Sequence, residues 1–219
     1  MLSGCGGAHP YVPLTAANLG KAMTAATEGL HTAHEVSTSN GATATIDFDS
    51  SGVLKYRLTQ TSGSSSQSLI GIGSDRYLQE PGVTPSGKWL KVPSGSGAAI
   101  SVEDLNPVAM VMRFDKGLKS FAYVGSTTIA GAQVQHYRIV IDQQKYLKAT
   151  GQGIGSANLG SAETVTENLY LNDDNTLRRV TLALPGGVGD TQVDVTGWGR
   201  AVTIEAPPAS AVVTSVPKR

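Results

Sequence analysis

The chain has 219 residues, and its 17 lysine and arginine residues balance its 17 aspartate and glutamate residues. A formal net charge of zero excludes a general nucleic-acid binder, because such proteins need a basic surface that releases counterions from phosphates. Hydrophobic residues make up 40% of the chain but aromatic residues only 5%, and charged residues are 16%, a composition that favours an exported β-protein with an aliphatic core. The single cysteine excludes an intrachain disulfide, and the longest apolar run, Val108 to Met112, is far too short for a membrane-spanning helix.

The cysteine, Cys5, follows Leu2, Ser3 and Gly4 near the start of the sequence. This order resembles the lipobox of bacterial lipoproteins, in which a peptidase cuts before the cysteine and diacylglycerol is attached to its sulfur. A signal peptide has a charged region followed by an apolar region, and neither is present between Met1 and Cys5. Lipidation of Cys5 would therefore require both regions to lie upstream of Met1. We expect residues 1–14 to form a lipid anchor at Cys5 and a flexible Gly/Pro-containing tether. The alternative is an exposed, accidental thiol.

The first regular element predicted is a helix from Ala16 to about Gly29. Thr15 is a suitable N-cap, because its side chain can accept a hydrogen bond from the first turn. Apolar residues then recur at spacings of three and four, at Leu19, Met23, Ala26 and Leu30. This stripe is expected to pack against a sheet.

Alternating apolar and polar residues predict strands from Ala44 to Val92. Ala44, Ile46 and Phe48 alternate with polar residues, and Leu54, Tyr56 and Leu58 do so after a turn. Further strands are predicted around residues 69–72, 76–79 and 88–92, with Gly71 marking a bend or a close backbone approach. The alternation predicts one dry and one solvated face.

A second helical stripe interrupts the strands. Val102, Leu105, Val108, Ala109 and Met112 fall on one helical face, and Ser101 is a possible N-cap. Because proline is tolerated only in a first turn, we expect two short helices that meet at Pro107. Such a broken helix has few backbone bonds to lose and could open as a lid.

Strands resume in the second half of the chain. We predict them at residues 122–131, 133–142, 167–171, 177–184 and 192–198, with a short helix or turn at 143–149 and a turn at 172–175. Tyr137, Ile139 and Ile141 share one face of their strand, and Val180 and Leu182 share one face of theirs. No domain boundary is evident, and we expect a single domain over residues 15–213 followed by a tail at 214–219.

Catalytic and cofactor motifs are weak or missing. The sequence has no Gly-x-Ser-x-Gly nucleophile motif and no phosphate-binding loop, and the glycines of 151–155 do not match the dinucleotide pattern. His31 and His34 are three residues apart at the start of a strand, where they point to opposite faces, so no metal site is predicted. Asp173 and Asp174 are best explained as turn residues. We therefore predict neither an enzyme nor a cofactor.

The last two thirds of the chain resembles actinobacterial envelope lipoproteins of the LppX/LprG type, whose fold is similar to that of LolA. The resemblance depends on three stretches, "AGAQVQHYRIVIDQQKYLKA", "ENLYLNDDNTLRRVTLALPG" and "VDVTGWGRAVTIEAPPASAVV". Within them the matching residues are Gly131, His136-Tyr137, Asp142, the Leu171–Asn175 turn, Trp198-Gly199 and Pro207-Pro208. The resemblance implies a mainly β (α+β) fold, a strongly curved antiparallel half-barrel with helices covering its concave face.

The resemblance also implies a non-enzymatic envelope lipoprotein that carries acylated lipid in a cavity between sheet and helices. We expect a monomer, anchored by lipid to the extracytoplasmic face of the cell membrane, with no nucleic-acid partner. The expected ligand-binding residues are Phe48, Leu54, Tyr56, Leu58, Leu105, Ala109, Met112, Tyr137, Ile139, Ile141, Val180 and Leu182. Two other hypotheses remain: a regulatory or sensory lipoprotein on the same scaffold that binds a protein partner, and a hydrolase with a scattered site.

Overall fold

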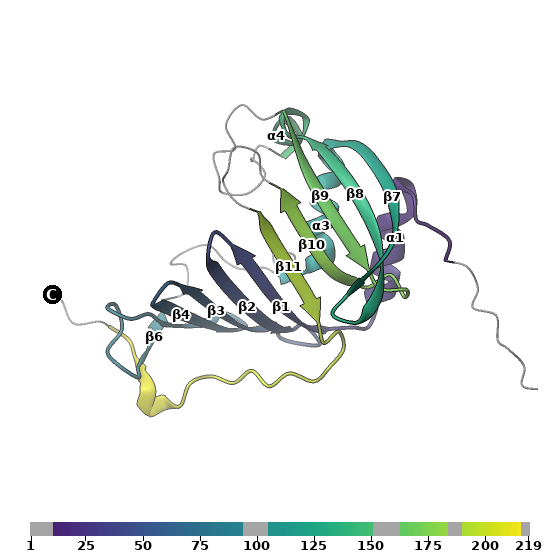
Figure 1. Ribbon diagram of the computed structural model, residues 1–219. Helices are drawn as coiled ribbons and strands as arrows, with labels where there is room; N and C mark the ends of the chain where they lie inside the picture. The colour runs from purple at the N-terminus through teal and green to yellow at the C-terminus, as the bar shows by residue number, and fades with distance from the viewer. Residues whose placement is uncertain (1–10, 94–104, 151–162, 184–189, 216–219) are drawn as a thin grey trace, which may run out of the picture.

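The computed structural model describes residues 11–93, 105–150, 163–183 and 190–215. Within them, twelve strands form one open, strongly bent sheet in the order β12-β6-β5-β4-β3-β2-β1-β11-β10-β9-β8-β7 (Figure 1). Every strand pair is antiparallel except β12 with β6. The predicted fold class, a curved antiparallel half-barrel, is confirmed.

The first half of the sheet is a continuous meander. Its strands are β1 (Thr32–Ser39), β2 (Ala42–Asp49), β3 (Lys55–Ser62), β4 (Ser65–Ile72), β5 (Asp75–Gln79) and β6 (Trp89–Val92). The hairpin predicted from the alternation around Phe48 and Tyr56 is confirmed, with these two residues directly opposite each other.

The second half is another meander, which returns from the far edge to pair with β1. Its strands are β7 (Leu118–Ile129), β8 (Ala132–Asp142), β9 (Thr164–Leu171), β10 (Leu177–Ala183) and β11 (Thr191–Thr196). The strand predicted at 122–131 begins earlier than expected, and its register shifts beside Gly125, where φ is +133°. That bulge sharpens the local twist and helps to bend this edge of the sheet.

The helices lie on one side of the sheet (Figure 1). These are α1 (Ala16–Thr27), α3 (Pro107–Met112), the 3-10 helix η1 (Arg113–Gly117) and α4 (Gln143–Thr150), while the short 3-10 helix η2 (Ala209–Ala211) belongs to the C-terminal segment. Helix α1 starts as predicted, with Thr15 N–H donating to Asn18 Oδ1 at 2.7 Å. Helix α3 begins at Pro107 because Asn106 Oδ1 accepts from the amides of Val108 and Ala109. The predicted cap Ser101 and Val102 lie outside the described residues.

The inner face of the sheet, which carries Tyr56 and Ile139, packs against these helices. Leu19 and Met23 of α1 and Val108 and Val111 of α3 belong to one buried cluster with the inward side chains of both halves of the sheet. The prediction that Tyr56 and Ile139 share a face is therefore confirmed. The helix face that points inward carries Val111, which the sequence analysis had not selected, while Ala109 and Met112 are half-buried.

Gly71 is the close approach that the sequence predicted. It lies opposite Tyr56 in the β3–β4 register, and the tyrosine ring occupies the space that a Cβ on Gly71 would need. Arg76 Nε donates to the Tyr56 hydroxyl at 3.2 Å. The glycine thus lets a large ring lie flat on the inner face of the sheet.

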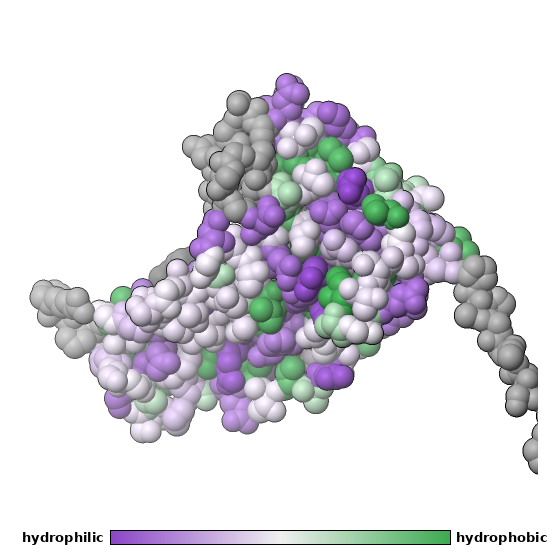
Figure 2. All heavy atoms as spheres, in the orientation of Figure 1, coloured by the Kyte–Doolittle hydropathy of each residue, from purple (hydrophilic) through white to green (hydrophobic). Residues whose placement is uncertain are grey.

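The outer face differs between the two halves. Over β4–β6 it carries a second cluster, in which Ile70 and Tyr77 pack with Ile204 of the C-terminal segment. That segment runs along the outer side of the first half and ends as β12 (Val212–Val213) beside β6 (Figure 1). Val202 and Ile204 of this segment thus cover part of the outer face of the sheet. The outer face of the second half, seen in Figure 2, is mixed, with hydrophobic residues in small separate groups.

Candidate functional site

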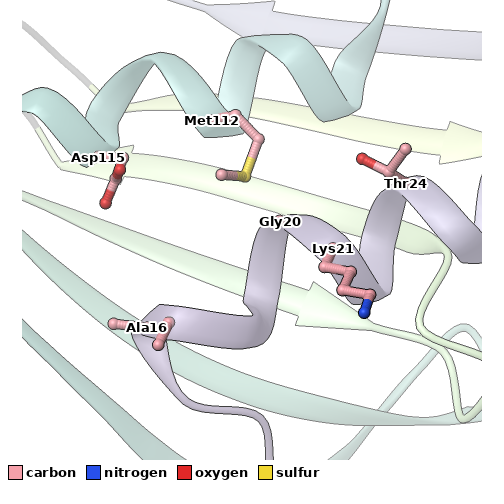
Figure 3. Close-up of a pocket in the computed structure, with 7 residues that line it drawn as sticks. Ala16, Gly20, Lys21, Thr24, Met112 and Asp115 are labelled. Atoms are coloured by element: carbon pink, nitrogen blue, oxygen red, sulfur yellow. The ribbon is translucent and has the colours of Figure 1, made fainter.

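The candidate site is a crevice between α1 and the α3–η1 segment (Figure 3). Its volume is about 440 Å³, which lies within the range of small-molecule binding sites. The crevice forms because α1 and α3 touch closely at one point and diverge beside it. Its lining residues are Ala16, Ala17, Gly20, Lys21, Thr24, Met112 and Asp115.

The contact between the two helices is made by Met112 and Gly20. The Met112 side chain points from α3 toward α1, and its Sδ and Cε atoms fill the space that a side chain on Gly20 would need (Figure 3). A thioether side chain is unbranched and flexible, so it can change rotamer at low cost. Met112 is therefore a movable wall of the crevice.

A narrow apolar throat lies directly beneath the crevice. The two share Ala16, Met112 and Asp115, so they are adjoining spaces. The throat is only about 20 Å³ in volume, room for a single water. Its other lining residues are Leu19, Val111, Leu118, Phe121 and Ile139.

The rim of the crevice is polar. Lys21 and Asp115 bring opposite charges from the two helices, Thr24 adds a hydroxyl, and all three side chains are exposed. The arrangement therefore places charged and hydrogen-bonding groups above an aliphatic and aromatic throat. This polarity matches the two ends of an amphiphile, although the throat as it stands has room only for a water.

The predicted ligand-binding residues divide into four groups. Met112 and Ile139 lie at the crevice and throat, whereas Phe48 lines a separate hollow of about 160 Å³ at the other end of α1. A third group is packed in the core or against it, namely Leu54, Tyr56, Leu105, Tyr137, Ile141, Val180 and Leu182. Leu58 lies half-buried on the inner face between Ile46 and Leu69, and Ala109 is half-buried on α3.

Two carboxyl groups on the inner face were missed by the sequence analysis. Glu167 of β9 is fully buried, and Glu35 of β1 is 7% exposed. Both Glu167 oxygens and Glu35 Oε1 lack a hydrogen-bond partner among the described residues. Burial raises the pKa of Glu167 to about 8 and that of Glu35 to about 7. A signal was present, because Glu167 alternates in phase with Leu169 and Leu171.

The N-terminal segment closes one end of the inner face. The hydroxyls of Tyr11 and Tyr137 are 2.6 Å apart, and the backbone amide of Leu14 donates to the Tyr137 hydroxyl at 3.0 Å. Burial and the hydrogen bond with Tyr137 raise the pKa of Tyr11 above its usual range. Residues 11–14 of the expected tether are thus held against the domain, while Cys5 lies outside the described residues.

The weak metal-site candidates have other partners. His34 Nδ1 is 2.7 Å from Asp47 Oδ1, while the neighbouring Glu35 faces the core. Asp173 Oδ1 accepts from Gln135 Nε2 at 2.9 Å, and Asp174 Oδ1 accepts from the Thr176 amide and hydroxyl. The Asp174 contacts are those of a turn-forming residue, as the sequence predicted.

Comparison with solved structures identifies the fold. LprF from Mycobacterium bovis superposes with a TM-score of 0.57 at 16% identity, covering 88% of this chain and 96% of that chain. The lipoprotein LppX from Mycobacterium tuberculosis superposes with a TM-score of 0.58 at 16% identity, and the match covers 87% of this chain and 98% of that chain. No protein-family model and no curated protein matches the sequence. The predicted resemblance to LppX/LprG-type lipoproteins is confirmed at the level of the fold.

Within the described part of the chain, no helix is both long and apolar enough to cross a membrane.

Proposed function

We propose that the protein is a non-enzymatic envelope lipoprotein that binds and carries acylated amphiphiles. The observation that carries the proposal is the polar-rimmed crevice above an apolar throat, with Met112 between them. An acyl chain entering the throat would displace Met112 and lie against Phe121 and Ile139. The head group would stay at the rim, near Lys21 and Asp115.

The energetics suit reversible carriage. Each methylene that leaves water contributes about 0.8 kcal/mol, so a chain of ordinary length can offset the opening of a closed throat. Release then requires only that the crevice opens near a membrane. The seven residues that line the crevice include neither an imidazole nor a thiol, and binding of this kind needs neither.

Blocking the mouth of the crevice tests the site. Ala16 is exposed at the start of α1 and lines both crevice and throat, so Ala16→Trp fills the entrance without crowding the core. We expect the variant to bind a fluorescent long-chain acyl probe at least several-fold more weakly than the unmodified protein. Mass spectrometry of an organic-solvent extract should likewise show less co-purified amphiphile.

Ala25→Trp is the matched control, because Ala25 is exposed on the same helix and is not a lining residue. It should bind the probe as the unmodified protein does. Equal binding by both variants would show that the crevice is not the ligand site.

A second candidate function is an envelope protein that binds a protein partner on the same scaffold. The small volume of the throat, about 20 Å³, favours it because no chain fits without movement. The solvent extract separates the two functions. Bound amphiphile supports carriage, and an empty extract together with no probe binding supports the protein partner.

We also propose that Cys5 carries the lipid anchor, which would place the monomeric domain at the extracytoplasmic face of the cell membrane. When the full gene is expressed, Cys5→Ser should move the protein from the membrane fraction to the soluble fraction, because the variant has no thiol to acylate. Ser3→Ala keeps a small residue in the lipobox and should stay with the membrane. Sedimentation of Cys5→Ser with membranes, and no acyl mass on the unmodified protein, would overturn the anchor.

A further inference from the structure

Glu167 is the most unusual polar group on the inner face. It lies in the middle of β9, its side chain is fully buried, and neither carboxyl oxygen has a hydrogen-bond partner among the described residues. Burying a polar group without a partner destabilises the folded state. A group that the fold leaves unpaired at such a cost is a candidate for pairing with a ligand.

The nearest neighbours of Glu167 on the sheet are all aliphatic. Val165 and Leu169 flank it on the same strand and face, Ile139 lies opposite on β8, and Leu182 lies opposite on β10. None of these side chains can donate or accept a hydrogen bond. The sheet residues around Glu167 therefore cannot satisfy its carboxyl group, which has no hydrogen-bond partner among the described residues.

The position of Ile139 connects Glu167 to the proposed binding site. Ile139 lines the throat beneath Met112, and it is the direct cross-strand partner of Glu167. Directly opposite residues of antiparallel strands have Cβ atoms about 4.5–5.5 Å apart. Glu167 does not itself line the throat, but it is the immediate cross-strand neighbour of a residue that does. Glu35, between Ile46 and Val195, has no such connection.

We infer that Glu167 is an interior anchor that donates a hydrogen bond to the carbonyl oxygen of an ester or amide linkage in the acylated amphiphile. The inference rests on the proposed function and names the group that the site recognises. A long-chain ester brings one strong acceptor into an apolar interior, and a protonated carboxyl is a matching donor. Burial raises the pKa of Glu167 to about 8, so this donor is present at neutral pH.

The test compares two probes of equal chain length, a fluorescent acyl ester and its alkyl ether, which lacks the carbonyl. The unmodified protein should prefer the ester by several-fold to about tenfold, the worth of one buried hydrogen bond. Glu167→Leu removes the donor and should abolish the preference. Glu167→Gln keeps a hydrogen-bond donor in a side chain of the same shape, so this variant should still prefer the ester. If Glu167→Leu does not fold, Glu167→Met replaces it.

The outcomes separate this inference from the function on which it rests. No preference in the unmodified protein, or a preference that survives Glu167→Leu, overturns the role of Glu167. If both probes still bind and Ala16→Trp weakens both, carriage through the crevice stands without the anchor. Binding of neither probe overturns the proposed function itself, and the anchor with it.

Discussion

Replacing Glu167 by glutamine is expected to make the domain more stable at pH 8 and to leave its stability at pH 5 nearly unchanged. In the fold, burial raises the pKa of Glu167 from 4.5 to about 8. The unfolded chain exposes this carboxyl, which then ionises near its ordinary pKa. Between those two values the folded state holds a proton that the unfolded state has released.

The extra proton held by the folded state decides whether stability rises or falls with pH. Below pH 4.5 both states are protonated, and the native state is not penalised. As the pH rises toward 8, the unfolded state gains an ionised, hydrated carboxylate that the folded state lacks, so the free energy of unfolding falls. Because one pKa unit corresponds to about 1.4 kcal/mol, the total loss is on the order of 3 to 5 kcal/mol. Glutamine does not titrate and avoids that loss.

No charged neighbour opposes this effect among the described residues that adjoin Glu167 on the sheet. Val165, Leu169, Ile139 and Leu182 surround it on the sheet, and the side chain diagonal to it on β8 is the titratable Tyr137. Glu35 titrates in the same direction, with a pKa raised to about 7, so the variant should keep part of the pH dependence.

Urea unfolding at pH 5, 6, 7 and 8, followed by circular dichroism, measures the effect. Glu163→Gln is the control, because Glu163 is exposed just before the same strand, and its curve should follow that of the unmodified protein. If Glu167→Gln and the unmodified protein keep a constant difference from pH 5 to pH 8, the carboxyl is not buried as the structure has it.

Removing the Tyr137 side chain is expected to cause the largest loss of stability, about 3–5 kcal/mol for Tyr137→Ala. The residue is fully buried, and its ring packs against Phe121 and Tyr123, with centroids 5.3 Å away in each case. Its hydroxyl bonds with Tyr11 and Leu14. Alanine at this position therefore has two effects: it leaves a cavity in the core, and it releases the N-terminal segment.

Tyr137→Phe separates these two effects. It keeps the ring but leaves the Leu14 amide without its acceptor, and we expect a loss of about 1–3 kcal/mol. Hydrogen exchange at the Leu14 amide should become fast in this variant, because that amide bonds to the removed hydroxyl. Tyr170→Phe removes a hydroxyl from the outer face and should change stability by less than about 0.5 kcal/mol. An unchanged Leu14 exchange rate in Tyr137→Phe would show that the Tyr137 hydroxyl does not hold the N-terminal segment.

Local pattern was sufficient to identify most elements and their inward faces. Phe48 and Tyr56 alternate with polar neighbours, and a strand has a period of two, so their shared face could be predicted before any pairing was known. The same holds for Tyr137, Ile139 and Ile141. Helix α1 was identifiable because Thr15 caps it and Leu19 and Met23 recur at helical spacing.

Contacts between distant segments could not be predicted in this way. The Met112–Gly20 contact joins residues far apart in the chain, and only the packing of α3 on α1 creates the crevice beside it. Ile70 and Ile72 looked like part of a short buried strand, but what covers their outer face is the C-terminal segment with Ile204. Glu167 lies in phase with Leu169, yet its lack of a hydrogen-bond partner among the described residues depends on what the two neighbouring strands, β8 and β10, place beside it.

The sequence by itself therefore determined most of the secondary structure and the inner face, because these depend on periodicities that adjacent residues carry. The class of fold followed from the resemblance to LppX/LprG-type lipoproteins. The tertiary structure alone decided where the binding crevice lies, which carboxyl lies opposite a residue of its throat and how Tyr11 closes one end of the sheet. These features depend on which side chains meet across the fold. A one-dimensional pattern fixes the direction of a side chain from its own strand or helix, but not the residue that it meets there.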